Sequence, residues 1–256
     1  MFRYSDYRPS IDARRKPVRV IRDLLLSPSD KIRAMNFDSL IQTVAVYALP
    51  VLFAITLHEA AHAFAARYFG DNTAYAAGRM SINPLKHIDP LGTILIPILL
   101  FISTGGAFLF GYAKPVPVQF DRLRNPKRDM RWVALAGPAA NLVMAFIWAL
   151  FGIVLTVSAV TEPFFFKMVQ AGISTNLVLF AFNLFPIPPL DGGRIAFSLL
   201  PNRSAWQYAK LEPYGFYIVL ALAMTKVLYP IWISPMVFAG GALLSLVLTP
   251  FQFLLN

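Results

Sequence analysis

Three residues early in the chain have the spacing of a metal-dependent hydrolase. His58 and His62 lie four positions apart, and Glu59 directly follows the first histidine. On a helix, side chains four apart project from the same face, so both imidazoles can bind one zinc ion. A glutamate at this position can take a proton from the water that zinc activates. The spacing predicts a zinc hydrolase with Glu59 as its general base.

A catalytic zinc ion needs a third protein ligand and one open position. The chain has no cysteine, so Asp191 and His87 are the candidates. His87 stands in the polar stretch 86–89, where a solvated or capping histidine is the more common interpretation. Asp191 follows three prolines and precedes two glycines, a pattern that breaks a helix within a membrane and turns a side chain inward. We expect Asp191 to be the third ligand, and a helix cap is its alternative role.

The elements that must position these residues are membrane helices. Hydrophobic residues make up 57% of the chain and charged residues 14%, compared with about 25% charged residues in soluble domains. Apolar stretches long enough to cross about 30 Å of hydrocarbon recur along the chain. They are 40–69, 91–110, 132–160, 168–185, 214–229 and 231–255, and of these the stretch 214–229 is marginal in length. A carboxylate within such a stretch costs about 2.5–3.5 kcal/mol, so Glu59 and Asp191 indicate function.

We predict an all-α multi-pass membrane protein with five to six transmembrane or re-entrant helices. Asp89 and Pro90 predict a helix start, after which the stretch 91–110 either crosses the membrane or enters it and returns. A short helix is expected over 194–200. Residues 73–83 predict a short strand pair, which would form a β-hairpin near the active site.

The net charge of +10 is concentrated beside the apolar stretches. Nine of the 23 Lys and Arg residues precede Met35, and six lie between Lys114 and Arg131. Basic clusters beside membrane spans mark cytoplasmic loops and contacts with anionic lipid. We therefore expect a lipid bilayer, and no nucleic acid, as a partner. Residues 1–36 form a basic, flexible extension in this interpretation, and a translation start at Met35 is the alternative.

The two chemical elements together resemble the site-2 protease family of intramembrane zinc metalloproteases. In that family a His-Glu-x-x-His helix precedes an Asn-x-x-Pro-x-Pro-x-Leu-Asp-Gly element. The chain matches the second element at Asn183, Pro186, Pro188, Leu190, Asp191 and Gly192. The segments 137–141 and 83–90 are similar to compact bacterial members. The resemblance covers residues 37–200, and no segment resembles the PDZ domain that some members insert.

The resemblance implies a single membrane-embedded peptidase domain over residues 37–256. One zinc ion, held by His58, His62 and Asp191, would cleave a transmembrane protein substrate with Glu59 as the base. The strand pair at 73–83 would either pair with the unwound substrate or only pack beside the site.

Two asparagines are further candidates for this site. Asn141 and Asn183 are expected to bind the substrate or the developing oxyanion. The alternative role for both is hydrogen bonding between helices, and Asn183 could also position the Asp191 loop.

The expected location is the prokaryotic cytoplasmic membrane, with the active site towards the cytoplasmic side. The basic residues before Met35 oppose this orientation unless translation starts there. Other functions fit part of the pattern. A prenyl-protein-type membrane protease would need a glutamate as third ligand, whereas a zinc-binding transporter would spread its ionisable residues over several spans. A catalytically silent scaffold would lack Glu59 or a ligand.

Overall fold

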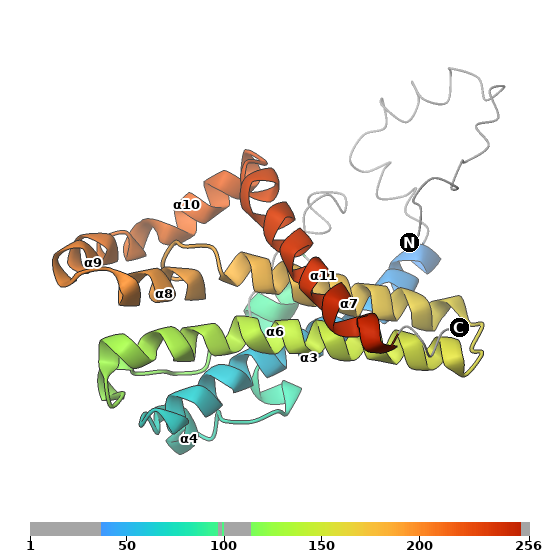
Figure 1. Cartoon of the computed structure of the whole chain (residues 1–256), viewed down its shortest axis with the longest axis horizontal. Helices are drawn as coiled ribbons and strands as arrows, with labels where there is room; N and C mark the ends of the chain where they lie inside the picture. Colours follow the sequence, from blue (N-terminus) through green and yellow to red (C-terminus); the bar gives the residue numbers. More distant parts are fainter. Residues whose placement is uncertain (1–36, 97–98, 100–113, 252–256) are drawn as a thin grey trace.

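The computed structural model describes residues 37–96, 99 and 114–251, and every element in this part of the chain is helical (Figure 1). The elements in order are α3 (Phe37–Tyr68), α4 (Thr73–Ala76), η1 (Pro84–Lys86), η2 (Pro90–Leu95), η3 (Phe120–Arg122), α6 (Pro126–Val157), α7 (Pro163–Asn183), α8 (Asp191–Leu199), α9 (Asn202–Ala209), α10 (Glu212–Met224), η4 (Tyr229–Ile233) and α11 (Ser234–Leu248). The predicted extension 1–36 lies outside the described residues.

Four helical segments are long and apolar enough to cross a membrane, counting only the described residues. They are Ile41–Tyr68 of α3, α6, α7, and the segment Tyr229–Phe251 that joins η4 to α11. The multi-pass prediction is therefore confirmed. The predicted total of five to six stays a prediction, because most of 91–110 lies outside the described residues. The 13 residues of α10 reach only about 20 Å, which is too short to cross the hydrocarbon.

The core of the molecule is a bundle of α3, α6 and α7, each packed against the other two. Small residues line these contacts. Ala66 of α3 is buried beside Val133 of α6, and a Cβ added to Gly172 of α7 would lie 2.3 Å from the Trp148 ring of α6. Small residues allow membrane helices to approach closely, where van der Waals packing and hydrogen bonds hold them. The bundle therefore brings α6 and α7 directly against the helix that carries the His-Glu-x-x-His residues.

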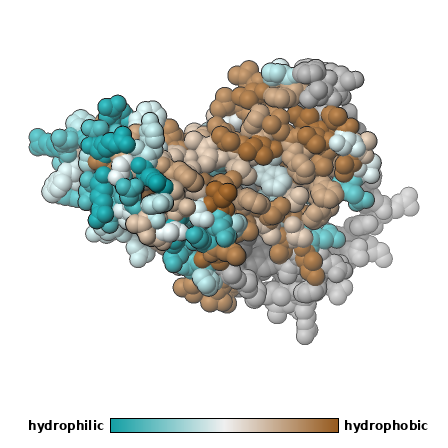
Figure 2. Space-filling model, turned by 90° about the horizontal axis from the view of Figure 1, so that it is seen from below, coloured by the Kyte–Doolittle hydropathy of each residue, from teal (hydrophilic) through white to brown (hydrophobic). Residues whose placement is uncertain are grey.

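Apolar and polar surfaces separate along the long axis of the molecule. Figure 2 shows hydrophilic residues gathered at one end and apolar residues over most of the rest of the visible face. In Figure 1 the hydrophilic end holds α4, α9 and the start of α6. Large apolar side chains such as Val143, Ile147 and Val154 point outward from α6. An outer apolar face of this kind suits contact with lipid.

The strand pair predicted for residues 73–83 is wrong. Asp71 accepts hydrogen bonds from the backbone N–H and the hydroxyl of Thr73, and the chain turns at once into the single turn of α4. Gly78, with φ of +64°, follows this turn, and Asn83 caps η1 by accepting from the Leu85 N–H. Asp and Asn side chains bend the backbone through such local bonds, and here these bonds prevail over strand formation.

Other helix boundaries follow local capping signals. Asp89 accepts hydrogen bonds from the N–H groups of Leu91 and Gly92, and Pro90 is the first residue of η2, so the predicted helix start is confirmed. α8 begins at Asp191, three residues earlier than expected. Asp191 therefore stands at the junction between an irregular loop and a helix.

Candidate metal centre

The structure brings His58, His62 and Asp191 together from opposite parts of the chain. The two histidine Nε2 atoms lie 3.1 Å apart, and each is 3.3 Å from Asp191 Oδ2. Tetrahedral zinc with bonds of about 2.0–2.1 Å holds its ligand atoms roughly 3.3 Å apart. The spacing of the three side chains therefore fits a zinc ion.

The protons of the two imidazoles point away from this cluster. His58 Nδ1 lies 2.7 Å from the Asn141 side-chain oxygen, and His62 Nδ1 lies 2.8 Å from the Val133 carbonyl oxygen. Both partners can only accept, so each ring donates from Nδ1, and a neutral ring in this orientation turns its lone pair at Nε2 towards the cluster. Two such lone pairs cannot bond to each other, and the buried Asp191 Oδ2 has no hydrogen-bond partner. A cation bound between these two nitrogen atoms and the Asp191 oxygen would interact favourably with all three.

Asp191 reaches the cluster because the loop before it folds tightly against glycines. A Cβ on Gly192 would lie 2.1 Å from the Leu184 carbonyl oxygen, and one on Gly193 would lie 2.3 Å from Pro188 N. Gly215 of α10 meets the same loop at the Pro188 carbonyl oxygen. The two glycines after Asp191 thus leave room for the loop to double back over the first turn of α8.

Helix α6 approaches the histidines at another glycine. A Cβ on Gly137 would lie 2.3 Å from His62 Nε2 and 2.7 Å from His58 Nε2. Any side chain at this position would therefore occupy the space between the candidate ligand atoms.

The Glu59 side chain contacts an extended segment that precedes α6. Its Oε2 accepts a hydrogen bond of 2.7 Å from the Val116 N–H. The segment 114–119 has no helical structure, and its residues Pro115 and Pro117 have no N–H to donate. The backbone of this segment therefore orients the carboxylate beside the two histidines. Sequence analysis missed this contact, because a backbone N–H is present at almost every residue.

The two candidate asparagines have different surroundings. Asn141 is fully buried, and its amide nitrogen donates to the Ala54 carbonyl and to Asn176 Oδ1 at 3.1 and 3.0 Å. Both N–H bonds are thus engaged, and none is left for an oxyanion, which favours the interhelical role. Asn183 donates to the Leu179 carbonyl of its own helix, and its role at the site stays a prediction. Asn176 was not singled out from the sequence, because it belongs to no recognised motif.

His87 lies apart from the metal cluster. It is the C-cap residue of η1, as a capping histidine would be, but it is buried rather than solvated. Its Nε2 lies 2.7 Å from the Ser81 carbonyl oxygen. His87, the less favoured candidate for the third ligand, is therefore held by a local hydrogen bond and is not part of the metal cluster.

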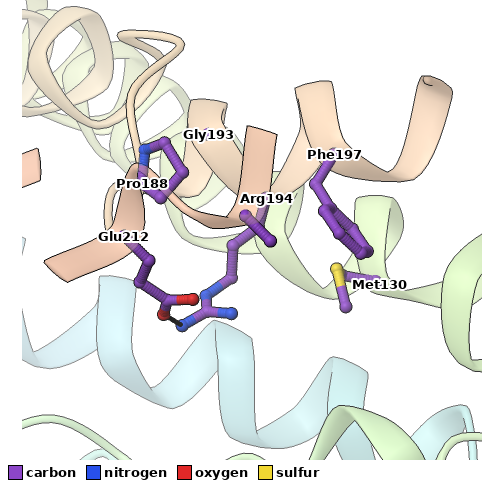
Figure 3. Close-up of a pocket in the computed structure, with 7 residues that line it drawn as sticks. Met130, Pro188, Gly193, Arg194, Phe197 and Glu212 are labelled. Atoms are coloured by element: carbon purple, nitrogen blue, oxygen red, sulfur yellow. Dashed lines mark hydrogen bonds and ion pairs between the residues drawn. The ribbon is translucent and has the colours of Figure 1, made fainter. Parts of the chain in front are cut away.

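A pocket lies between α8, the loop before it, and residues of α6, α9 and α10 (Figure 3). It is lined by Met130, Pro188, Gly193, Arg194, Phe197, Ala209 and Glu212. The Arg194 guanidinium donates to the Glu212 carboxylate at 2.9 Å and so joins α8 to α10. Exposed pairs of this kind contribute about 0–1 kcal/mol, so this ion pair adds little to the attachment of α8.

Comparison with known proteins gives consistent results. The model of Peptidase family M50 matches residues 152–226. Three relatives share the printed name "Putative zinc metalloprotease". YwhC of Bacillus subtilis is 39% identical over 219 residues, which cover 81% of this chain and 93% of the relative. Rip2 of Mycolicibacterium smegmatis is 31% identical over 204 residues, 78% of this chain and 73% of the relative. MJ0611 of Methanocaldococcus jannaschii is 26% identical over 188 residues, 72% of this chain and 84% of the relative. No solved structure matches significantly.

Proposed function

The chain belongs to peptidase family M50, the site-2 proteases, and on that basis we propose that it hydrolyses peptide bonds within membrane-spanning proteins. Family membership makes it a membrane zinc metalloprotease. The finer step, cleavage of a substrate inside the bilayer, is supported by one observation above all. The two imidazoles of the cluster lie on α3, a helix long and apolar enough to span, beside Gly137 of α6, and the carboxylate comes from the first residue of α8.

We assign His58, His62 and Asp191 as the zinc ligands. A bound zinc ion would polarise the scissile carbonyl and would lower the pKa of water, so that water could lose a proton near neutral pH and attack that carbonyl. The three side chains supply two neutral nitrogen donors and one anionic oxygen. This donor set leaves one tetrahedral position open, as catalytic zinc sites require.

Glu59 is the proposed general base. Its Oε2 accepts the Val116 N–H, so we assign the transferred proton to Oε1. The carboxylate takes this proton from the attacking water and then delivers it to the leaving amine nitrogen, which completes the hydrolysis. The Val116 contact keeps the carboxylate beside the imidazoles through both transfers.

The position of the cluster along α3 supports cleavage near one surface of the membrane. His62 lies six residues before the end of α3 at Tyr68, or about 9 Å along the helix axis. A substrate helix hides its peptide bonds in its own hydrogen bonds and must unwind locally before cleavage. The scissile bond is therefore expected near an end of the substrate span, where unwinding exposes fewer backbone groups to hydrocarbon.

We place the hydrophilic end, and with it the active site, on the cytoplasmic side of a prokaryotic membrane. Six Lys and Arg lie between Lys114 and Arg131, before and within the start of α6. The connection 158–162 at the other end of α6 contains none. Basic residues close to span ends favour the cytoplasmic side.

The test of the proposed function is cleavage of a single-span protein by the purified full chain in detergent, with zinc measured in the same preparation. Glu59→Gln is expected to keep zinc and lose cleavage, because the amide cannot take a proton. His58→Ala and Asp191→Ala are expected to lose both. A chelator should abolish wild-type cleavage, and added zinc should restore it.

Two results would contradict these assignments. Full activity in Glu59→Gln would show that another group is the base. Zinc retained at wild-type affinity in both His58→Ala and Asp191→Ala would show that the ion is bound elsewhere.

A further inference from the structure

Two asparagines lie behind the histidine cluster, where α3, α6 and α7 meet. Asn141 and Asn176 are both fully buried, with no exposed surface. A buried amide is costly unless its polar atoms find partners. Asn141 donates to the Ala54 carbonyl and to Asn176 Oδ1, and Asn176 donates to the Gly172 carbonyl at 2.8 Å. The two side chains therefore form a chain of hydrogen bonds that ends at His58.

Two backbone carbonyls give this chain its direction. The Gly172 carbonyl can only accept, so the Asn176 atom facing it is nitrogen, and its oxygen faces Asn141. That oxygen and the Ala54 carbonyl both face the same atom of Asn141, which must then be its nitrogen. The remaining Asn141 atom is oxygen, and it lies 2.7 Å from His58 Nδ1. Rotating either amide by half a turn would bring two acceptors together.

The direction of the chain sets the chemical state of His58. An acceptor at Nδ1 requires a ring proton there, so the neutral ring presents its Nε2 lone pair to His62 and Asp191. We propose that Asn176, acting through Asn141, is a positioning residue that selects the zinc-binding tautomer and orientation of His58. The inference rests on the proposed zinc site, and it gives α7, which carries none of the proposed ligands, a part in binding the metal.

The two histidines are held by different means. His62 donates to the Val133 carbonyl of α6, a backbone group that no substitution of a side chain removes. His58 has only a side-chain acceptor, which itself depends on a second side chain. Changes at Asn141 or Asn176 should therefore disturb His58 and leave His62 in place.

The competing role for Asn176 is hydrogen bonding that merely holds α7 against α6. Under that role, any loss of packing on α7 would act in the same way as loss of the amide. Leu177 provides the matched comparison, because it is the next residue on α7 and is buried against Ala145 and Ala149 of α6 and Leu244 of α11. Leu177→Ala weakens this packing and leaves the hydrogen-bond chain intact.

The experiment measures zinc affinity of the full chain in detergent by competition with a chromophoric chelator. Cobalt(II) absorption provides a second readout that reports the geometry of the ligands. Asn176→Leu is expected to lower zinc affinity about 10-fold and Asn141→Leu up to about 100-fold, the range seen when partners of metal-bound histidines are removed. Both should change the cobalt spectrum. Asn176→Asp, which in its neutral form keeps an acceptor for Asn141 and a donor for Gly172, should retain most of the affinity.

Leu177→Ala should lower the melting temperature and leave zinc affinity within about twofold of wild type. The inference is overturned if Asn176→Leu keeps wild-type affinity and spectrum, or if Leu177→Ala changes both as much as Asn176→Leu does. Should Asn176→Leu fail to fold, Asn176→Ser replaces it, with the same expected loss, because the shorter hydroxyl cannot reach Asn141. A wild-type chain that binds no zinc would instead contradict the proposed function.

Discussion

At the scale of single residues, the candidate site depends on two histidine Nε2 atoms that are free to bind a metal and on a glycine that leaves space beside them. Both histidines donate a proton from Nδ1, so in the neutral rings two Nε2 lone pairs and the Asp191 carboxylate oxygen face one another. Gly137 leaves open the space beside them, because a Cβ at this residue would lie 2.3 Å from His62 Nε2. The glycine is therefore required by the approach of α6 to the site and not by its own backbone conformation.

Gly137→Ala is expected to lower zinc affinity with little effect on helix formation. Alanine favours a helix more than glycine does, but its methyl group would overlap the ligand atoms. Overpacking of this kind costs about 1–3 kcal/mol, which corresponds to about a 5- to 150-fold loss of affinity. Chelator competition on the purified chain would measure this loss.

Gly241→Ala is the matched control for this prediction. A Cβ at Gly241 of α11 would meet no atom within 4 Å. Its zinc affinity should equal that of the wild type. A Gly137→Ala variant that bound zinc equally well would show that α6 can move away from the histidines at no cost.

At the scale of elements, the extended segment 114–119 is fastened to α3 and to the turn after it by two carboxylates. Glu59 Oε2 accepts from the Val116 N–H, and Asp71 Oδ2 accepts from the Gln119 N–H at 2.8 Å. Glu59 is the proposed general base, and Asp71 has no part in the proposed chemistry. The Asp71 contact thus fixes the far end of the segment that orients the general base.

The pKa of the Asp71 carboxyl reflects this anchoring role. Burial alone would raise its pKa, but hydrogen bonds from Thr73 and Gln119 and the nearby charge of Arg122 together hold it below the ordinary value. The folded chain therefore binds this proton less readily than the unfolded chain does. The stabilisation is fully present above about pH 4, the ordinary aspartate range, and is lost as the pH falls through the lower folded value.

Asp71→Asn should therefore lower stability at neutral pH and matter less in acid. Hydrogen bonds to a charged group contribute about 1.5–3 kcal/mol, and the amide cannot accept on both sides. Melting temperatures of wild type and variant in detergent should differ by a constant amount from pH 8 to 5 and converge as the pH falls below about 4. A gap that stays constant down to pH 3 would contradict a role for the charge.

At the scale of the whole molecule, the antiparallel α3, α6 and α7 place the chemistry near one end. In Figure 1, the end of α3, the start of α6 and the α7–α8 loop lie towards the end that Figure 2 shows as hydrophilic. Water and an unwound substrate segment are more accessible there than at the middle of the bilayer. Under the proposed function, the orientation of this end decides near which side of the membrane the substrate is cleaved.

Cysteine labelling tests the orientation directly, because the chain contains no native cysteine. Asn125→Cys and Ser158→Cys place single thiols at exposed positions beside opposite ends of α6. In intact spheroplasts, a membrane-impermeant maleimide should label position 158, and position 125 should react only after the membrane is opened. The reverse pattern would place the active site on the outer side of the membrane.

The sequence by itself determined the chemical class and the membrane setting. The spacing of His58 and His62 acts within two turns of one helix, and the prolines and glycines around Asp191 break the chain locally, so both signals are visible without tertiary structure. Composition and the lengths of the apolar stretches predicted an all-helical membrane protein. The strand pair at 73–83 was predicted wrongly, because Asp71 accepts two hydrogen bonds from Thr73 and the chain turns there into α4.

Only the tertiary structure decided which distant groups complete the site. The partners of Glu59 and His62 are a backbone N–H and a backbone carbonyl. Such groups occur at nearly every residue, so no residue type in the sequence marks them. Whether Asn141 faces a substrate or a histidine depends on how α6 rotates against α3, and Asn176 gains its role only because α7 packs beside both. Such contacts arise from the close approach of three helices, which local residue patterns do not specify.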